Sequence, residues 1–294
     1  TQIETIIENI KEEDIISASE NELTNIAQDI SKKLAEASEL IVSIEDPEVA
    51  ADLAKELIQK AGTLAERLID ANNTTAYDAL VKDTKQLANA VILSVGKLEL
   101  DEEAITSDDG KVTAQVKFGE AEEEKLDLLI KLAQELNKAA KEAGIDEDIV
   151  EPVLVIDVTT GEESSSASVE VPSNLVLALS EKGIKSMVIS TDVATFSVPV
   201  DAISVGTNDV IKLNAEKVDN SALPNEAKEL VRDAPVFDLY ITVNDVRVSS
   251  YNKLIGVRLP YTLKPGEDPE RITVFYINEE GQLENVIGKY DEET

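Results

Sequence analysis

The chain has 294 residues, of which 60 are acidic and 27 are basic, so its formal net charge at pH 7 is -33. A negative field of this size disfavours nucleic acids and anionic membranes as partners. Cysteine and histidine are both absent, which excludes disulfides, zinc–thiolate sites and any catalytic triad that relies on imidazole. The length exceeds that of one ordinary domain, so two or three domains are expected.

Aromatic side chains and long apolar runs are scarce. Tryptophan is absent, and the chain has four phenylalanines and six tyrosines, which leaves few flat surfaces for stacking sugars or bases. No stretch approaches the ~20 apolar residues that span a bilayer, and Thr1 does not begin a signal peptide. Membrane insertion is therefore not expected, and the chain is predicted to be a processed part of a longer protein.

The first 96 residues show helical periodicity. Three successive segments, 23–44, 53–68 and 76–95, carry an apolar residue at every third or fourth position. Asp46 is predicted to cap the second helix, with Pro47 at its first position. Because the connections are short, neighbouring helices should run antiparallel and form an up-down-up bundle roughly 30 Å long.

A further apolar-faced helix is predicted at the N-terminus. Ile3, Ile6, Ile7 and Ile10 lie on one face of such a helix. The segment could complete a four-helix bundle or pack elsewhere, and we expect it to be added to the bundle.

Beyond Gly96 the pattern changes to strands interrupted by helices. Residues 108–110 form a turn signal between the segments 98–105 and 112–118, which are predicted to pair as a hairpin. A helix follows around 126–136 and ends near Gly144. The other predicted elements of this part are strands at 153–158, 167–171, 184–189 and 194–198, a helix at 172–182 and a short helical turn at 199–203.

From residue 210 the pattern is mainly β. Strands are predicted at 210–217, 236–243, 257–260, 272–277 and 283–287, with turns at 244–245 and 279–282. Residues 289–294 resemble the approach to one more turn, so a final strand is expected to be missing and an edge to be exposed.

These patterns together predict an α+β fold. An N-terminal antiparallel helical bundle is followed by mixed strand and helix units and then by a mainly antiparallel β region. Three domains are expected: a helical bundle at 1–96, an α+β domain at 97–206, and a mainly β domain at 207–294 that lacks its final strand.

No residue is predicted to be catalytic, cofactor-binding or metal-ligating, and no cofactor is expected. Acidic runs at 101–103, 108–109 and 122–124 could bind calcium, but none has the spacing of a calcium loop, and such runs are usually solvated surface. Two carboxylates could act as a glycosidase pair, but no motif places two acids in a cleft, so the chain is expected not to be an enzyme. The loop 161–166 has one glycine and two acids, and we interpret it as a hairpin tip and not as a phosphate-binding loop.

Two features leave alternatives open. Tyr240, Tyr251, Tyr261 and Tyr276 could line a sugar-binding face, although cross-strand packing with the hydroxyls at the rim is favoured. The apolar helix faces could bind a partner helix or self-associate, although covering one another within the chain is the default.

Three stretches of the second half form a recognisable set. The first combines VEVP at 169–172, LVLAL at 175–179, glycine and isoleucine at 183–184, and FSVP at 196–199. The second is APVFDLYITV at 234–243. The third and most specific consists of VRLPY at 257–261, PGEDPE at 265–270, ITVFYI at 272–277, GQLE at 281–284 and KYD at 289–291. The set resembles a non-catalytic α+β module of Gram-positive extracellular proteins that usually precedes C-terminal S-layer homology repeats, which anchor proteins to the wall.

This resemblance covers residues 150–294 and not the helical front. It implies an extracellular location at the cell wall or S-layer and a spacer or scaffold role, and it brings no catalytic residues. The leading hypothesis is a structural segment of a secreted bacterial cell-surface protein that positions an outward region relative to the wall. Its partners would be cell-wall or surface-layer components, or further copies of the chain. The alternative is an adhesin or carbohydrate-binding module with a polysaccharide ligand, and an acid-pair glycoside hydrolase is less favoured.

Overall fold

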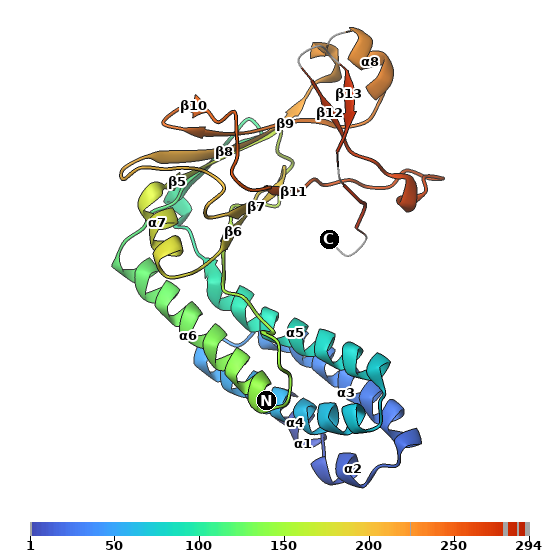
Figure 1. Cartoon of the computed structure of the whole chain (residues 1–294). Coiled ribbons are helices and arrows are strands. Elements are labelled where there is room, and N and C mark those ends of the chain that lie inside the picture. The colour runs from blue at the N-terminus through green and yellow to red at the C-terminus, as the bar shows by residue number, and fades with distance from the viewer. Residues whose placement is uncertain (1, 224, 279–281, 287, 292–294) are drawn as a thin grey trace.

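The structure is a computed structural model, and it describes residues 2–223, 225–278, 282–286 and 288–291. Long helices form one end of the molecule and strands form the other (Figure 1). The predicted α+β class, with the helices first, is confirmed.

Three long helices form the bundle that the apolar periodicity predicts: α3 (Glu20–Ile41), α4 (Pro47–Asp70) and α5 (Thr74–Gly96). The Asp46 carboxylate accepts hydrogen bonds from the backbone N–H groups of Glu48 and Val49 at 2.9 and 3.3 Å, which confirms it as the N-cap of α4. The leucine and alanine stripes of these helices are buried within the chain.

The predicted N-terminal helix is divided into two short helices, α1 (Gln2–Glu8) and α2 (Glu12–Ser17). Between them the Ile10 N–H donates to the Ile7 carbonyl at 3.1 Å, a three-residue closure that ends α1. Helix α1 contacts α3 and α4, and α2 contacts α4. The fourth long helix of the bundle comes from further along the chain: α6 (Glu120–Glu142) packs on α4 and α5.

Helix α6 lies close to α4 for two reasons. The Lys55 ammonium lies 2.8 Å from the Glu135 carboxylate across the two helices. A Cβ atom on Gly62 of α4 would lie only 2.4 Å from the Cβ of Ala143, so glycine is required for this approach.

The strands form two sheets and one separate ribbon. The five-stranded sheet has the order β1 (Lys97–Leu98), β4 (Val153–Asp157), β6 (Ser186–Ser190), β7 (Thr195–Pro199) and β11 (Gly256–Arg258). The six-stranded sheet has the order β10 (Val246–Arg247), β9 (Val236–Val243), β8 (Val210–Val218), β5 (Ser166–Pro172), β3 (Lys111–Gln115) and β2 (Ile105–Asp108). Strands β12 (Phe275–Ile277) and β13 (Leu283–Asn285) pair with each other as an antiparallel ribbon.

Burial alternates along the central strands because successive side chains point to opposite faces of a sheet. In β5, for example, Ala167, Val169 and Val171 are buried while the residues between them are half-exposed. These inner faces belong to one hydrophobic cluster that also contains the helical stripes and extends in sequence from Ile3 to Ile241. The helical and β halves therefore share a single core.

The predicted pairing of 98–105 with 112–118 is only partly correct. Strands β2 and β3 form the antiparallel hairpin, and Asp109 and Gly110 have the positive φ values of its two-residue turn. Leu98 instead lies in β1 and is parallel to Ile156 of β4. The reason is that Leu98 follows α5 directly and joins the five-stranded sheet, whereas the hairpin of β2 and β3 begins later in the chain and belongs to the six-stranded sheet.

Several shorter elements complete the fold. Helix α7 (Ser173–Glu181) confirms the predicted helix before Gly183, whereas α8 (Asn225–Val231) is absent from the sequence prediction. The segment 199–203 forms a turn, closed by the Ala202 N–H and the Pro199 carbonyl at 2.9 Å, and not a helix. Short 3-10 helices are η1 (Glu102–Ala104), η2 (Asn220–Ala222) and η3 (Pro269–Arg271). Residues 279–281 of one predicted turn, and the end of the chain at 292–294, lie outside the described residues.

Packing crosses both predicted domain boundaries. Helix α6 lies within the 97–206 segment but packs on the helices of 1–96. Strands β8 and β9, from the 207–294 segment, extend the sheet of β3 and β5, and β11 extends the sheet of β4, β6 and β7. The division into 1–96, 97–206 and 207–294 remains a prediction about folding units. Its boundaries do not coincide with the sheets, because each sheet contains strands from more than one of these segments.

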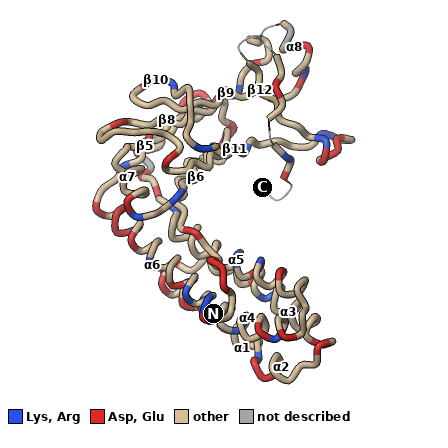
Figure 2. The backbone as a smooth tube through the Cα atoms, in the orientation of Figure 1, with Lys and Arg blue, Asp and Glu red and all other residues tan. Residues whose placement is uncertain are grey.

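Acidic residues are distributed along both halves of the molecule and not collected in one block (Figure 2). None of the described helices combines the length and the apolar character that a bilayer span needs.

Candidate functional site

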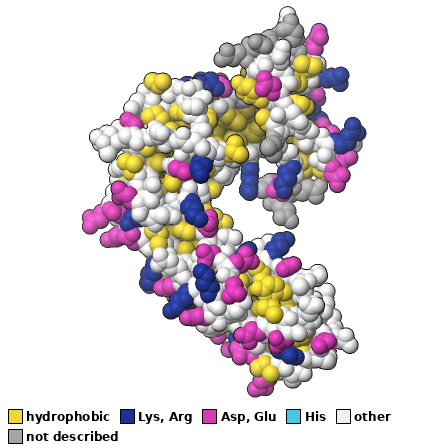
Figure 3. All heavy atoms as spheres, viewed as in Figure 1, with side chains coloured by type: hydrophobic (Ala, Val, Ile, Leu, Met, Phe, Trp, Pro, Cys, Tyr) yellow, Lys and Arg dark blue, Asp and Glu magenta, His cyan; other side chains and the backbone are white. Residues whose placement is uncertain are grey.

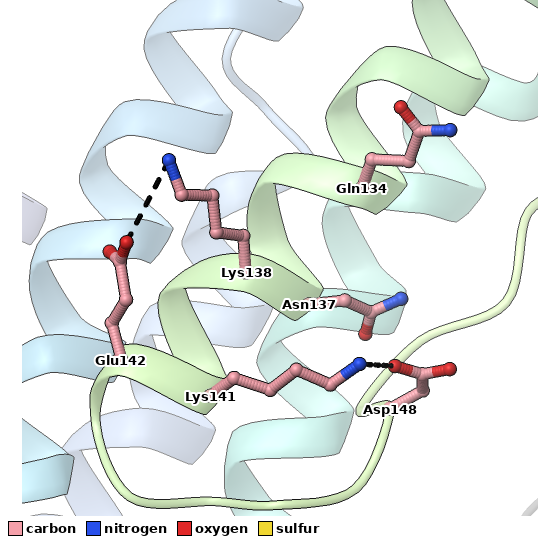
Figure 4. Close-up of a pocket in the computed structure, with 6 residues that line it drawn as sticks. All are labelled: Gln134, Asn137, Lys138, Lys141, Glu142 and Asp148. Carbon is pink, nitrogen blue, oxygen red and sulfur yellow. Dashed lines mark hydrogen bonds and ion pairs between the residues drawn. The ribbon is translucent and has the colours of Figure 1, made fainter.

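A shallow hollow of about 480 Å³ lies between α6 and the segment that leads from α6 to β4 (Figure 4). It is lined by polar and charged side chains: Gln134, Asn137, Lys138, Lys141, Glu142 and Asp148.

Asn137 connects the two walls of this hollow. Its Oδ1 accepts hydrogen bonds from the backbone N–H groups of Ile149 and Val150 at 2.8 and 3.0 Å, and its Nδ2 donates to the Val150 carbonyl at 2.8 Å. These bonds are half-buried and satisfy the backbone just before β4. The amide is therefore engaged in holding the chain to α6.

The charged groups of the hollow are paired with each other. Lys141 lies 2.7 Å from Asp148, and Lys138 lies 3.7 Å from Glu142, as the dashed lines in Figure 4 show. All four side chains are more than half exposed, so each pair contributes little stability. The lining contains no nucleophile held by a base, so its arrangement supports no covalent chemistry.

A second hollow, of about 570 Å³, lies at one end of the paired strands β8 and β9 of the six-stranded sheet. Its apolar wall is formed by Pro235, Val236, Phe237 and Pro260. Beside it, the Lys264 ammonium lies 2.6 Å from the Asp233 carboxylate. Hydrophobic side chains gather on the surface next to β9 and β12, as Figure 3 shows.

The acidic runs lie in three separate places. Residues 108–109 form the end of β2 and its turn, 101–103 follow β1, and 122–124 lie near the start of α6. There the Glu122 carboxylate accepts a hydrogen bond from the Gly119 N–H at 2.8 Å. Among the residues that the structure describes, no three acidic side chains are grouped as a metal ion would require. The acidic runs therefore lend no geometric support to a calcium site.

The loop 161–166 joins β4 to β5, which belong to different sheets, so its interpretation as a hairpin tip is wrong. The Asp192 carboxylate accepts hydrogen bonds from the backbone N–H groups of Thr160 and Gly161 at 2.9 and 3.1 Å. A phosphate-binding loop offers such N–H groups to its ligand. Here a carboxylate of the chain itself occupies them.

The four tyrosines of the β half differ in their surroundings. Tyr240 is half-buried in β9, with an arginine guanidinium 4.5 Å from its ring centroid, and the Tyr261 hydroxyl donates to the Glu267 carboxylate. Tyr251 and Tyr276 are exposed, at 42% and 54% of their surface. Tyr240 therefore packs across strands, against Arg247 of β10, whereas Tyr261 lies in the loop between β11 and η3, and the other two tyrosines are open to solvent.

Shifted pKa values at the sheet surface follow from local pairs. The carboxylates of Asp245 and Glu170, at 2.8 and 3.0 Å, raise the pKa of Lys212. Burial opposes ionisation of Asp157, but hydrogen bonds from a threonine and from Lys97 outweigh it and lower the pKa of this carboxyl. Both shifts favour the charged form at neutral pH, so neither group is poised to exchange a proton there.

Comparison with protein-family models, with curated proteins and with solved structures finds no match to the chain.

Proposed function

We propose that the chain is a structural segment of a secreted bacterial cell-surface protein, which positions an outward region at a set distance from the cell wall. The observation that carries the proposal is the single hydrophobic cluster that includes both the helices and the sheets. A continuous close-packed core resists bending, whereas two domains on an open linker move independently. A stiff body of this kind suits a spacer.

The junction between the two halves supports the same role. Helix α5 passes into β1 without an intervening loop, and Asn137 holds the second connection, from α6 to β4. Where α5 ends, the Lys97 ammonium of β1 lies 3.0 Å from the Asp157 carboxylate of the neighbouring strand β4. Both connections are packed, so a load applied to one half is carried by several contacts to the other.

The composition and the charge pairs in the hollow beside α6 support a non-enzymatic function without a cofactor. The sequence has no histidine or cysteine, and the charged groups that line the helical hollow pair with each other. The net charge of -33 would keep the segment away from anionic wall polymers. The resemblance of residues 150–294 to a module of Gram-positive surface proteins supports an extracellular location, with cell-wall or surface-layer components as neighbours.

Sedimentation with purified cell walls and with insoluble glycans tests this proposal. A spacer should remain in the supernatant, and small-angle X-ray scattering should show one particle of constant shape at all salt concentrations. Specific pelleting would overturn the spacer role in favour of an adhesin, and release of reducing sugar from a glycan would overturn the non-enzymatic one.

A carbohydrate-binding module is the second candidate, because the ribbon of β12 and β13 presents aromatic rings to solvent. Phe275 and Tyr276 are exposed over 50% and 54% of their surface, and such rings stack on sugars. If the chain does pellet with a glycan, Tyr276→Ala should abolish the pelleting. Tyr251→Ala, which removes an exposed ring outside the ribbon, should leave it unchanged.

A further inference from the structure

One side of β9 is unpaired over half of its length. On its inner side β9 pairs with β8 along the whole strand, from Val236 to Val243. On its outer side β10 pairs only with Thr242 and Val243, and the Val248 N–H adds one hydrogen bond to the Ile241 carbonyl at 2.8 Å. Within the described part of the chain, no strand continues the sheet beyond the first half of β9.

The bond at Ile241 identifies the backbone groups that face the open side. In an antiparallel ladder, every second residue directs its N–H and C=O to the same neighbour. Leu239 and Phe237, two and four residues before Ile241, therefore direct theirs away from β8. No backbone hydrogen bond between described residues uses these groups on the open side. The edge thus offers two donors and two acceptors, with a repeat of about 6.8 Å along the strand.

Two usual protections of a strand edge, free charges and prolines, are missing from the first half of β9. Natural sheets protect their edges with free charges, prolines, bulges or covering loops. The one charged residue in the exposed half of β9 is Asp238, and Arg247 pairs with it at 2.8 Å. Proline occurs at position 235, before the strand begins, so it removes no donor from the edge.

An apolar surface accompanies the open edge. Phe237 and Leu239 pack only partly on the core, and all residues from 236 to 240 are half-buried. The hollow of about 570 Å³ begins at Val236 and Phe237 and reaches Pro260. Open backbone groups and a neighbouring hollow with an apolar wall are the two parts of a site that adds a strand: the backbone supplies affinity and the apolar wall accepts side chains.

We propose that the open edge of β9 binds an extended peptide segment of a partner protein, which joins the six-stranded sheet as an additional strand. The segment carries alternating apolar side chains, and its remaining side chains are uncharged or basic. The inference goes beyond the spacer role and does not depend on it.

The chemistry of the edge selects this occupant. An extended peptide repeats its N–H and C=O groups at the spacing of the open groups of β9, whereas a glycan or a helix does not. A second copy of the chain is disfavoured, because each copy carries a net charge of -33 and the two repel. The same field attracts a basic segment.

The test uses the whole chain and a synthetic peptide of eight residues, acetylated and amidated, in which valine alternates with threonine and lysine. Isothermal titration should show saturable binding with one site. A peptide of the same sequence, N-methylated at each central residue, cannot donate from either edge and should bind about tenfold more weakly or less. Equal affinity for the two peptides, or no binding of either, would overturn the proposal.

Two variants locate the site. Leu239→Pro removes an outward N–H from β9 without removing a bond to β8, and should reduce affinity about tenfold. Ser107→Pro is the matched control, because in the β2–β3 hairpin Ser107 also directs its N–H away from its partner strand, at the opposite edge of the same sheet. It should bind like the wild type.

If Leu239→Pro does not fold, Thr262→Lys provides an independent variant, since it places a positive charge, which repels a basic segment, in the hollow from outside the sheet. It should also weaken binding. Unchanged affinity in a folded Leu239→Pro chain, or an equal loss in Ser107→Pro, would refute the assignment to β9. A dimer in sedimentation equilibrium that Leu239→Pro dissociates would replace the partner peptide with a second copy.

Discussion

Gly96 shows how a single residue decides how the helices meet the sheets. It is the last residue of α5, and a Cβ atom at this position would lie 2.2 Å from the Val153 carbonyl oxygen and 3.5 Å from a methyl group of Leu129. The end of α5, the start of β4 and the side of α6 therefore meet at one point. Only glycine leaves room for that approach.

Gly96→Ala should lower the free energy of unfolding by about 1–3 kcal/mol, because the added methyl group overpacks the junction. Alanine is the better helix former by about 1 kcal/mol, so a gain would be expected if the close approach did not exist. Urea denaturation measures the difference. Gly256→Ala is the control: its Cβ would lie 3.4 Å from the Cβ of Ser197, an ordinary contact, and its effect should stay within about 0.5 kcal/mol.

Asp157 leads to a prediction about pH. Its pKa is lowered in the folded chain, so its charged form contributes stability above the pKa of the unfolded chain, about 3.9, and that stability is lost as the pH falls through the lower folded value. Asp157→Asn should therefore be less stable than the wild type at pH 7 and at pH 5. As the pH falls through the lowered folded pKa, the two proteins should converge.

Denaturation series at several pH values measure this convergence. Asp201→Asn provides a comparison, because the Asp201 carboxylate is largely exposed and lies 3.6 Å from Lys253. An exposed pair of this kind contributes little, so the variant should differ little from the wild type at any pH. A difference for Asp157→Asn that stays constant over the whole acid range in which the chain remains folded would show that its effect is steric and not electrostatic.

At the scale of elements, α6 is the helix that connects the parts of the fold. The hairpin of β2 and β3 separates it in sequence from the bundle, yet it packs on α4 and α5. Lys131 of α6 lies 2.6 Å from Glu48 of α4, and Asp127 of α6 pairs with Lys182 after α7. Helix α6 therefore contacts both halves.

Asn137→Ala should lower the free energy of unfolding by about 2–4 kcal/mol, because two half-buried backbone N–H groups lose their acceptor. Amide hydrogen exchange should accelerate at Ile149 and Val150, and chemical denaturation should give the change in stability. Gln134→Ala, on the rim of the same hollow, is the matched control and should stay within about 0.5 kcal/mol. Similar results for the two variants would mean that the Asn137 bonds do not hold the connection.

For the whole molecule, the decisive feature is that one core includes both halves. A shared core predicts cooperative unfolding, because neither half can expose its inner face alone. The high negative charge opposes compactness through self-repulsion in both halves, so it does not make one half more stable than the other.

We expect the helical and β halves to unfold with the same denaturant midpoint. Circular dichroism at the helical band reports mainly the bundle, and tyrosine emission in a Tyr77→Phe variant reports the β half, because Tyr77 is the tyrosine in α5. Two separate midpoints would show that the halves fold independently, as the predicted boundary at residue 96 implies, and would weaken the case for a stiff spacer.

The sequence alone determined the features that depend on short-range patterns. Apolar periodicity and the Asp46 cap predict the long helices, and alternation predicts most strands. The Asn244-Asp245 turn has the positive φ values, 52° and 64°, that its two-residue hairpin requires. The absence of histidine and cysteine limits the chemistry of the chain whatever its fold.

Which elements meet depends on contacts that form in the folded chain. A strand pattern records which face is buried but not which strand lies beside it, so the place of Leu98 in β1 and the open side of β9 depend on partners distant in sequence. Asn137 and Gly96 follow no motif, because their roles arise from the backbone at 149–150 and at Val153. The helical period predicts α6, while its place in the bundle depends on close packing against Gly62, which the chain meets only when it folds.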